Sequence, residues 1–157
     1  MSKRDEVNTN GGMFNIYYGD AKKEGNTKLE DTGYLPNGTK GNFVITPRVG
    51  PFHIGMTSSV QKPGQGMEPH IHPTSSETLL CMKGKGQFYL KDKWIDVEEG
   101  DVLYAPPGIK HGSRCPENYS EPCTVVGIAS PPQLDLYLKS DYDPNGDDED
   151  YETEYHV

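Results

Sequence analysis

The chain has 157 residues, of which 32% are hydrophobic and 25% are charged, and its formal net charge is -9. This length fits one domain with a real core and is short for two. No apolar run approaches the roughly 18 residues that a membrane helix needs, and the first residues lack the apolar block of a signal peptide. We therefore expect a cytoplasmic protein without a membrane partner, and its three cysteines, which form no CxxC pair, indicate reduced thiols.

Most of the negative charge lies at the C-terminal end. Residues 141–157 contain eight acidic and no basic side chains, whereas the other 140 residues sum to -1. Such a run is typical of a solvated acidic tail, and its three tyrosines offer contact area for docking on a neighbouring surface. An acidic chain without a basic stripe argues against a nucleic-acid partner. We expect a polar arm at 1–12, one domain at 13–140 and an acidic tail at 141–157.

Short β-like runs separated by turn residues follow one another through the domain. The chain contains 18 Gly and 13 Pro, and no stretch before the tail shows sustained helical periodicity. This pattern predicts an all-β sandwich or barrel. The KGKG segment at 83–86 predicts a hairpin between two strands. In chain order, the expected strands are 13–18, 43–46, 52–60, 77–83, 87–90, 93–97, 102–105, 112–115, 124–129 and 134–138.

Two histidines separated by one residue stand out in the stretch PHIHPTSSETLL. On an extended chain, His70 and His72 project to the same face, which is chelating geometry. His111 lies about 40 residues further on, and an antiparallel barrel brings such segments to face each other across its interior. With Glu77, the three histidines form an N3O ligand set that suits Fe²⁺, Mn²⁺, Ni²⁺ or Co²⁺ and leaves coordination positions for substrate.

Two stretches resemble the paired motifs of the cupin superfamily. Residues 64–84 resemble G-x5-H-x-H-x4-E-x6-G, and residues 100–115 resemble G-x5-P-x-G-x2-H-x3-N, with Cys115 in place of the final Asn. The 15 residues between the motifs match the short spacing of small single-domain cupins. The matching positions are Gly64, His70, His72, Glu77, Gly84, Gly100, Pro106, Gly108 and His111.

The resemblance implies a single cupin jelly-roll β-barrel with extra N-terminal strands, and with its motif core at 64–115. It implies that His70, His72, Glu77 and His111 bind a divalent metal, with Fe²⁺ or Mn²⁺ favoured and Ni²⁺, Co²⁺ or Zn²⁺ as alternatives. Glu77 is either the fourth ligand or a catalytic base. The resemblance also implies a homodimer, because small cupins commonly pair their barrels through edge strands.

Strand phase adds weaker candidates for the lining of the pocket. Cys81 is in phase with Glu77, and Ser113 and Cys115 share the expected face of His111, with Arg114 pointing elsewhere. Both thiols also suit a buried place at the rim of the barrel. The remaining pocket candidates are Gln87, Tyr89 and Tyr104. His53 is interpreted as structural and His156 as solvent-exposed.

The function expected from this ligand set is that of a metal-dependent enzyme acting on a small oxygenated or carboxylate metabolite. Dioxygenase chemistry is slightly favoured. An isomerase, a decarboxylase or a lyase of the same fold is an alternative, as is a non-catalytic cupin that binds a small ligand such as a sugar.

Overall fold

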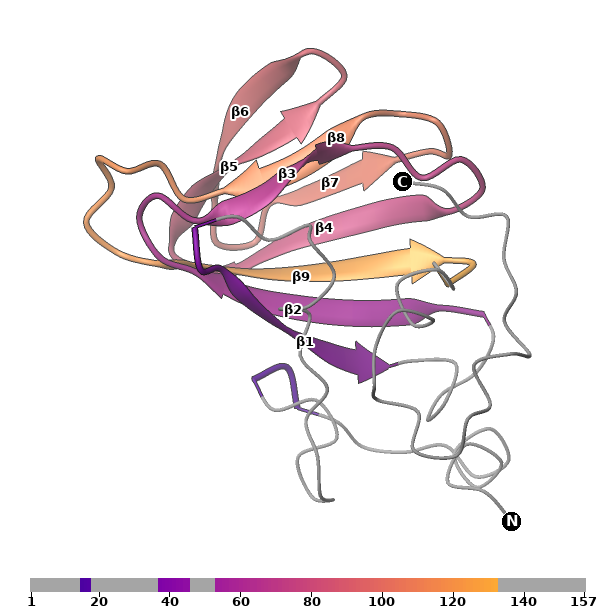
Figure 1. Ribbon diagram of the computed structural model, residues 1–157, viewed down its shortest axis with the longest axis horizontal. Coiled ribbons are helices and arrows are strands. Elements are labelled where there is room, and N and C mark those ends of the chain that lie inside the picture. The colour runs from indigo at the N-terminus through magenta and orange to yellow at the C-terminus, as the bar shows by residue number, and fades with distance from the viewer. Residues whose placement is uncertain (1–14, 18–36, 46–52, 133–157) are drawn as a thin grey trace.

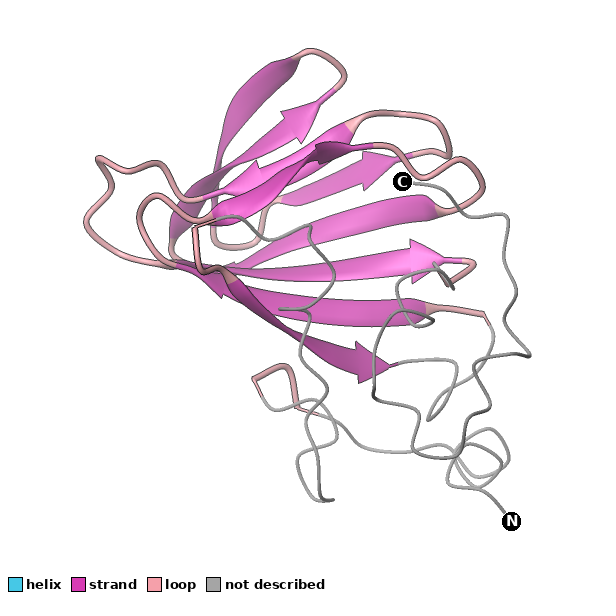
Figure 2. Ribbon diagram, in the orientation of Figure 1, coloured by secondary structure: helices cyan, strands magenta, loops and turns pink. Residues whose placement is uncertain are grey.

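The computed structural model describes residues 15–17, 37–45 and 53–132 (Figure 1). These residues form strands and loops only, so none of the described segments is a helix that could cross a membrane (Figure 2). The strands are β1 Lys40–Ile45, β2 Gly55–Gln61, β3 Gly66–His70, β4 Ser76–Lys83, β5 Lys85–Leu90, β6 Lys93–Glu98, β7 Val102–Ala105, β8 His111–Arg114 and β9 Cys123–Ser130.

Two antiparallel sheets make up the fold. The first has the strand order β1-β2-β9-β4-β7 and the second has the order β3-β8-β5-β6. Figure 1 shows the two sheets stacked, with the β5–β6 hairpin extending beyond the rest. Consecutive strands such as β3 and β4, or β4 and β5, belong to different sheets, which is the connectivity of a jelly roll. The all-β jelly-roll prediction is therefore confirmed.

Alternation along the strands builds the core between the sheets. In β4, Leu79 and Cys81 are buried whereas Thr78 and Leu80 are only half-buried, as a two-residue repeat requires. The inward face of β5 carries Phe88, which is 1% exposed. The core cluster consists of Leu79, Cys81, Phe88, Leu103, Ala105, Cys115, Cys123 and Val125.

The KGKG segment does not form the expected hairpin, because β4 and β5 lie in different sheets. Gly84 instead has φ of +80°, and it turns the chain from one sheet to the other. A Cβ at this position would collide with the backbone carbonyl of Pro122. Gly84 is therefore required both by its backbone conformation and by a close approach of two chain segments.

The described strands agree with the expected ones to within a few residues, with three differences. The expected strand at 52–60 begins only at Gly55, and His53 is exposed in a turn before it. Of the expected strand at 13–18, the described residues 15–17 form one bridge residue and a turn. The strand β3 was not expected as a separate element. The expected strand at 134–138, the arm at 1–12 and the tail at 141–157 lie outside the described residues.

Candidate metal centre

Neighbouring strands bring the first and last histidines together. His70 is the last residue of β3 and pairs in register with His111, the first residue of β8. The two segments therefore lie side by side in one sheet, whereas the sequence suggested that they face each other across the barrel. His72 lies two residues beyond the end of β3. Contrary to expectation, His70 and His72 therefore do not lie on one strand.

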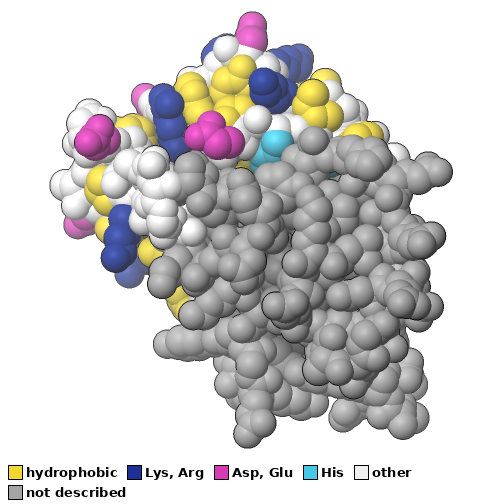
Figure 3. Space-filling model, in the orientation of Figure 1, with side chains coloured by type: hydrophobic (Ala, Val, Ile, Leu, Met, Phe, Trp, Pro, Cys, Tyr) yellow, Lys and Arg dark blue, Asp and Glu magenta, His cyan; other side chains and the backbone are white. Residues whose placement is uncertain are grey.

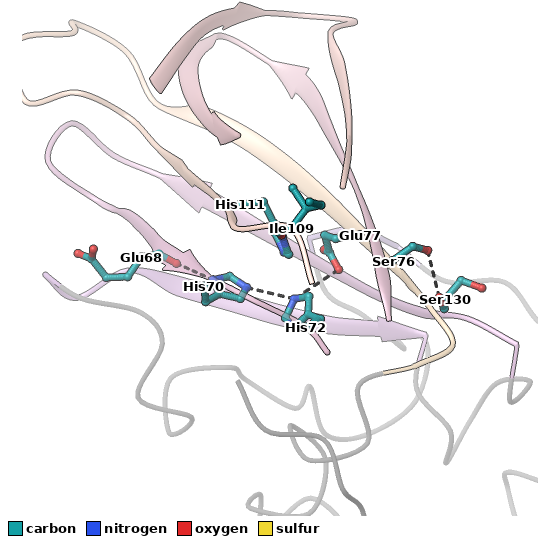
Figure 4. Close-up of polar contacts among 8 residues, drawn as sticks. All are labelled: Glu68, His70, His72, Ser76, Glu77, Ile109, His111 and Ser130. Carbon is teal, nitrogen blue, oxygen red and sulfur yellow. Dashed lines mark hydrogen bonds and ion pairs between the residues drawn. The ribbon is translucent and has the colours of Figure 1, made fainter. Parts of the chain in front are cut away.

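The three imidazole rings nonetheless form a compact triangle (Figure 4). Their centroids are 4.6, 4.7 and 4.7 Å apart, and the ring planes are inclined to one another by 56° to 64°. One ring nitrogen from each histidine lies within 4.8 Å of the other two. The Nε2 atoms of His70 and His72 are 3.1 Å apart. This clustering of nitrogens is the geometry that a single metal ion needs.

Backbone carbonyls set the tautomer of two of these rings. Nδ1 of His70 donates to the carbonyl of Glu68 at 2.5 Å, and Nδ1 of His111 donates to the carbonyl of Ile109 at 2.8 Å. Because a neutral imidazole carries one proton, these bonds leave both Nε2 atoms as lone-pair donors. Nε2 of His111 is buried without a hydrogen-bond partner in the described part of the chain.

Burial keeps the histidines neutral. His72 and His111 are 4% and 1% exposed, and desolvation lowers the pKa of His72 to about 2 and that of His111 to about 4. Burial also lowers the pKa of His70, which is only half-buried. On the face drawn in Figure 3, a histidine side chain reaches the surface among apolar and charged side chains. At neutral pH all three imidazoles are therefore unprotonated, as metal ligands must be.

Glu77 comes from the opposite sheet. It is 7% exposed, and its Oε2 lies 3.8 Å from Nε2 of His72 (Figure 4). Burial raises the pKa of Glu77 to about 8, so at pH 7 the contact joins a neutral carboxyl group to a neutral imidazole and is not an ion pair. Oε2 makes no hydrogen bond within the described residues.

Gly127 makes room for this carboxyl group. It faces the barrel interior on β9, and a Cβ there would lie 2.5 Å from Oε1 of Glu77 and 3.1 Å from Oγ1 of Thr57. The carboxyl group therefore lies against the backbone of β9, beside a threonine hydroxyl of β2. No side chain larger than hydrogen fits at position 127 without moving Glu77.

The donor set fits a divalent transition metal. Two buried atoms that can ligate, Nε2 of His111 and Oε2 of Glu77, make no hydrogen bond with the described residues, and leaving such atoms without one is costly. A cation held by the three histidines would satisfy His111, and Glu77 is near enough to His72 to take part after a small side-chain rotation. One carboxylate with three imidazoles is a donor set typical of Fe²⁺, Mn²⁺, Co²⁺ or Ni²⁺.

Both candidate thiols lie in the apolar core. Cys81 and Cys115 are 0% and 1% exposed, and Sγ of Cys81 is 3.7 Å from Sγ of Cys123. Cys81 is four residues from Glu77 along β4, which places it about 13 Å deeper in the barrel. The expectation that His111, Ser113 and Cys115 share a face is confirmed, since all three are buried and Arg114 is not.

The structure does not place the other three pocket candidates in the interior. Gln87 accepts a hydrogen bond from Arg114 and donates one to Asp96 on the outer face of the second sheet. Tyr89 packs edge-on against Trp94, which also stacks on Arg114. Contrary to expectation, Gln87 and Tyr89 therefore lie on the outer face of β5, and the inward position between them belongs to Phe88.

The expectation that Tyr104 lines the pocket is also wrong. It is 59% exposed and pairs in register with Thr78 on β4, so its side chain lies outside the barrel. The inward positions of β7 are taken by Leu103 and Ala105, both of which are buried.

The inward face of β2 is polar, which the sequence pattern did not predict. Thr57, Ser59 and Gln61 occupy alternate positions of β2 and face inward, whereas Val60 between the last two is exposed. Gln61 donates a hydrogen bond to Ser113 of the other sheet. The signal was present as polar residues at alternate positions in the segment MTSSVQ. It was not recognised, because a polar face on a strand ordinarily indicates the solvent side.

One family model matches the strands that build this site. Residues 57–128 match the family model described as Cupin domain. The chain carries a cupin domain. The match covers β2 to β9 almost completely and includes the three histidines, Glu77 and Gly127.

Solved structures with the same fold include an RmlC-like cupin from Shewanella frigidimarina, which is 17% identical, with a TM-score of 0.57 over 80% of this chain and 99% of the other. A cupin-like protein from Thermotoga maritima is 24% identical, with a TM-score of 0.55 over 65% of this chain and 74% of the other. The polyketide cyclase RemF from Streptomyces resistomycificus is 20% identical, with a TM-score of 0.52 over 60% of this chain and 66% of the other.

Among curated proteins, an uncharacterized protein from Aquifex aeolicus (strain VF5) is 36% identical over 63 residues. The aligned segment covers 40% of this chain and half of that relative. These comparisons show the fold, and they show a cupin domain at residues 57–128.

Proposed function

We propose that this cupin is a metal-dependent enzyme acting on a small oxygenated or carboxylate metabolite that binds at His70, His72, His111 and Glu77. The observation that supports this proposal is the convergence of three neutral imidazoles beside a buried carboxyl group whose pKa is raised to about 8. A site with this donor set and a proton-carrying acid can both bind an anion and transfer a proton.

The residues of the site have different roles. His70, His72 and His111 hold the metal, which when bound supplies Lewis-acid polarisation of an oxygen ligand. Glu77, protonated near neutral pH, is either the fourth ligand or the group that exchanges a proton with the substrate. Its pKa near the working pH suits a group that must both give and take a proton. Leu79 and Ala105 are buried on the inward faces of β4 and β7, and they keep bulk water away from the interior.

Within this class we favour oxygen chemistry with Fe²⁺ or Mn²⁺ as the metal. Isomerisation, decarboxylation and elimination use the same polarised ligand and the same acid, and with Ni²⁺, Co²⁺ or Zn²⁺ they become the expected reactions.

The experiment begins with anaerobic purification without chelator or a nickel column, followed by metal analysis. The protein is then reconstituted with Fe²⁺ or Mn²⁺ and assayed for O2 uptake and for product formation with diketones, phenols and hydroxy acids. Metal-dependent turnover that is lost in His70→Ala and kept in His53→Ala supports the proposal, because His53 is an exposed turn residue. Turnover without O2 uptake assigns the isomerase, decarboxylase or lyase branch. Ligand binding without any turnover would make the protein a binding module, and failure to bind metal would overturn the proposal.

A further inference from the structure

The barrel interior has an apolar side and a polar side. The core cluster fills the space next to β4, β5, β7 and β9. The inward faces of β2 and β8 instead carry hydroxyl and amide groups, at Thr57, Ser59 and Gln61 on one strand and at Ser113 on the other. Burying such polar groups costs free energy unless each of them finds a hydrogen-bond partner.

Two residues on this polar side join the sheets. Nε2 of Gln61 donates to Oγ of Ser113 at 2.7 Å, and the side chains are 1% and 2% exposed. Oε1 of Gln61 is buried and has no hydrogen-bond partner among the described residues. The Ser113 hydroxyl accepts in this bond, so its own hydrogen is available to a second group. The pair therefore presents one acceptor and one donor side by side.

The pair is aligned with the metal centre. Ser113 is two residues beyond His111 on the same inward face of β8, a separation of about 7 Å along the strand. Gln61 shares the inward face of β2 with Thr57, which lies beside Gly127 and the carboxyl group of Glu77. Gln61 and Ser113 thus lie further along the same inward faces that carry Thr57 and His111.

We propose that Gln61 and Ser113 form a subsite that binds a hydroxyl group of a ligand whose acid end is chelated at the three histidines. The inference rests on the proposed function, and it assigns polyhydroxylated acids of about four to six carbons as the ligand class. A hydroxyl group both donates and accepts, so it matches Oε1 of Gln61 and the hydroxyl of Ser113 together. A ligand ammonium does not suit this place, because Gln61 and Ser113 are both neutral and neither balances a buried positive charge.

The test compares two acids on the Mn²⁺-loaded protein by titration calorimetry. Gluconate and 2-hydroxyhexanoate have the same chain length and the same chelating end, but only gluconate carries distal hydroxyls. Gluconate is expected to bind about tenfold more tightly to the wild type, as one good buried hydrogen bond allows. Gln61→Leu removes this preference. Gln87→Leu, which changes a glutamine on the outer face, preserves it.

Equal affinities for the two acids in the wild type, or an unchanged preference in Gln61→Leu, would overturn the subsite and leave Gln61 to a buried water. A second measurement does not depend on metal. The metal-free double variant Gln61→Leu with Ser113→Ala is expected to melt at the wild-type temperature or above it, because it removes an unpaired buried acceptor. A clearly lower melting temperature would show that the pair is structural. If the protein binds no Mn²⁺, the proposed function fails, and the melting comparison still decides the role of the pair.

Discussion

Metal binding should release the proton that Glu77 carries, and this linkage tests the electrostatics of the whole site. In the metal-free protein, burial raises the pKa of Glu77 to about 8, whereas burial and neighbouring imidazoles lower those of His72 and His111. The histidines have therefore already lost their protons at pH 7, and Glu77 has not. A divalent cation favours the charged carboxylate, so binding expels one proton from one identified group.

The number of protons follows from the pKa. At pH 7 a group with a pKa of about 8 is about 0.9 protonated, and at pH 8 it is about half protonated. Three ordinary histidines with a pKa of 6.5 would release about 0.7 proton at pH 7 but only about 0.1 at pH 8. The value at pH 8 therefore separates the two sources.

The assay is calorimetric titration with Mn²⁺ or Co²⁺ in buffers of different ionisation enthalpy at pH 6, 7 and 8. The wild type should release about 0.9 proton at pH 7, falling to about half a proton at pH 8. Glu77→Gln should release almost none at pH 8. Release that disappears at pH 8, or equal release by the wild type and the variant, would refute the assignment of the proton to Glu77.

Other substitutions test separate parts of the site. His111→Ala should weaken Mn²⁺ or Co²⁺ binding by about 100-fold or more, since two imidazoles remain, whereas His53→Ala on an exposed turn should leave the affinity unchanged; both are measured by calorimetry. Gly127→Ala should displace the Glu77 carboxyl group and lower metal affinity about tenfold. The same change in a Glu77→Ala background should have a much smaller effect, because the 2.5 Å contact with Oε1 is gone and only the 3.1 Å contact with Oγ1 of Thr57 remains. In the metal-free protein, between pH 4.5 and about 8, the folded state keeps a proton on Glu77 that the unfolded chain loses. The contribution of this carboxyl group to the free energy of unfolding is therefore fully present below pH 4.5 and is lost as the pH rises through about 8. Urea unfolding should therefore show Glu77→Gln gaining stability over the wild type from pH 5 to pH 8, and a constant difference would contradict the buried, neutral carboxyl group.

Much of the site was predictable because it is encoded locally. The spacing of His70, His72 and Glu77 and the turn before His111 are short-range patterns, and the alternation along β8 correctly grouped His111, Ser113 and Cys115. Parity failed on β5, where Gln87 and Tyr89 proved to lie outside and Phe88 inside. Nothing in that segment distinguishes its two faces, since Phe88 and Tyr89 are both large aromatic residues and only the packing against the other sheet selects one of them.

The sequence by itself determined that the chain forms short strands with frequent turns, and that histidines and a glutamate recur at ligand spacing. It did so because hydrophobic alternation, turn residues and motif spacing are properties of neighbouring residues. Only the tertiary structure decided that β3 and β8 are adjacent, that Glu77 lies over Gly127, and that Gln61 meets Ser113. These contacts join segments far apart in the chain, and the pKa values of the site follow from burial, which exists only once the two sheets have packed together.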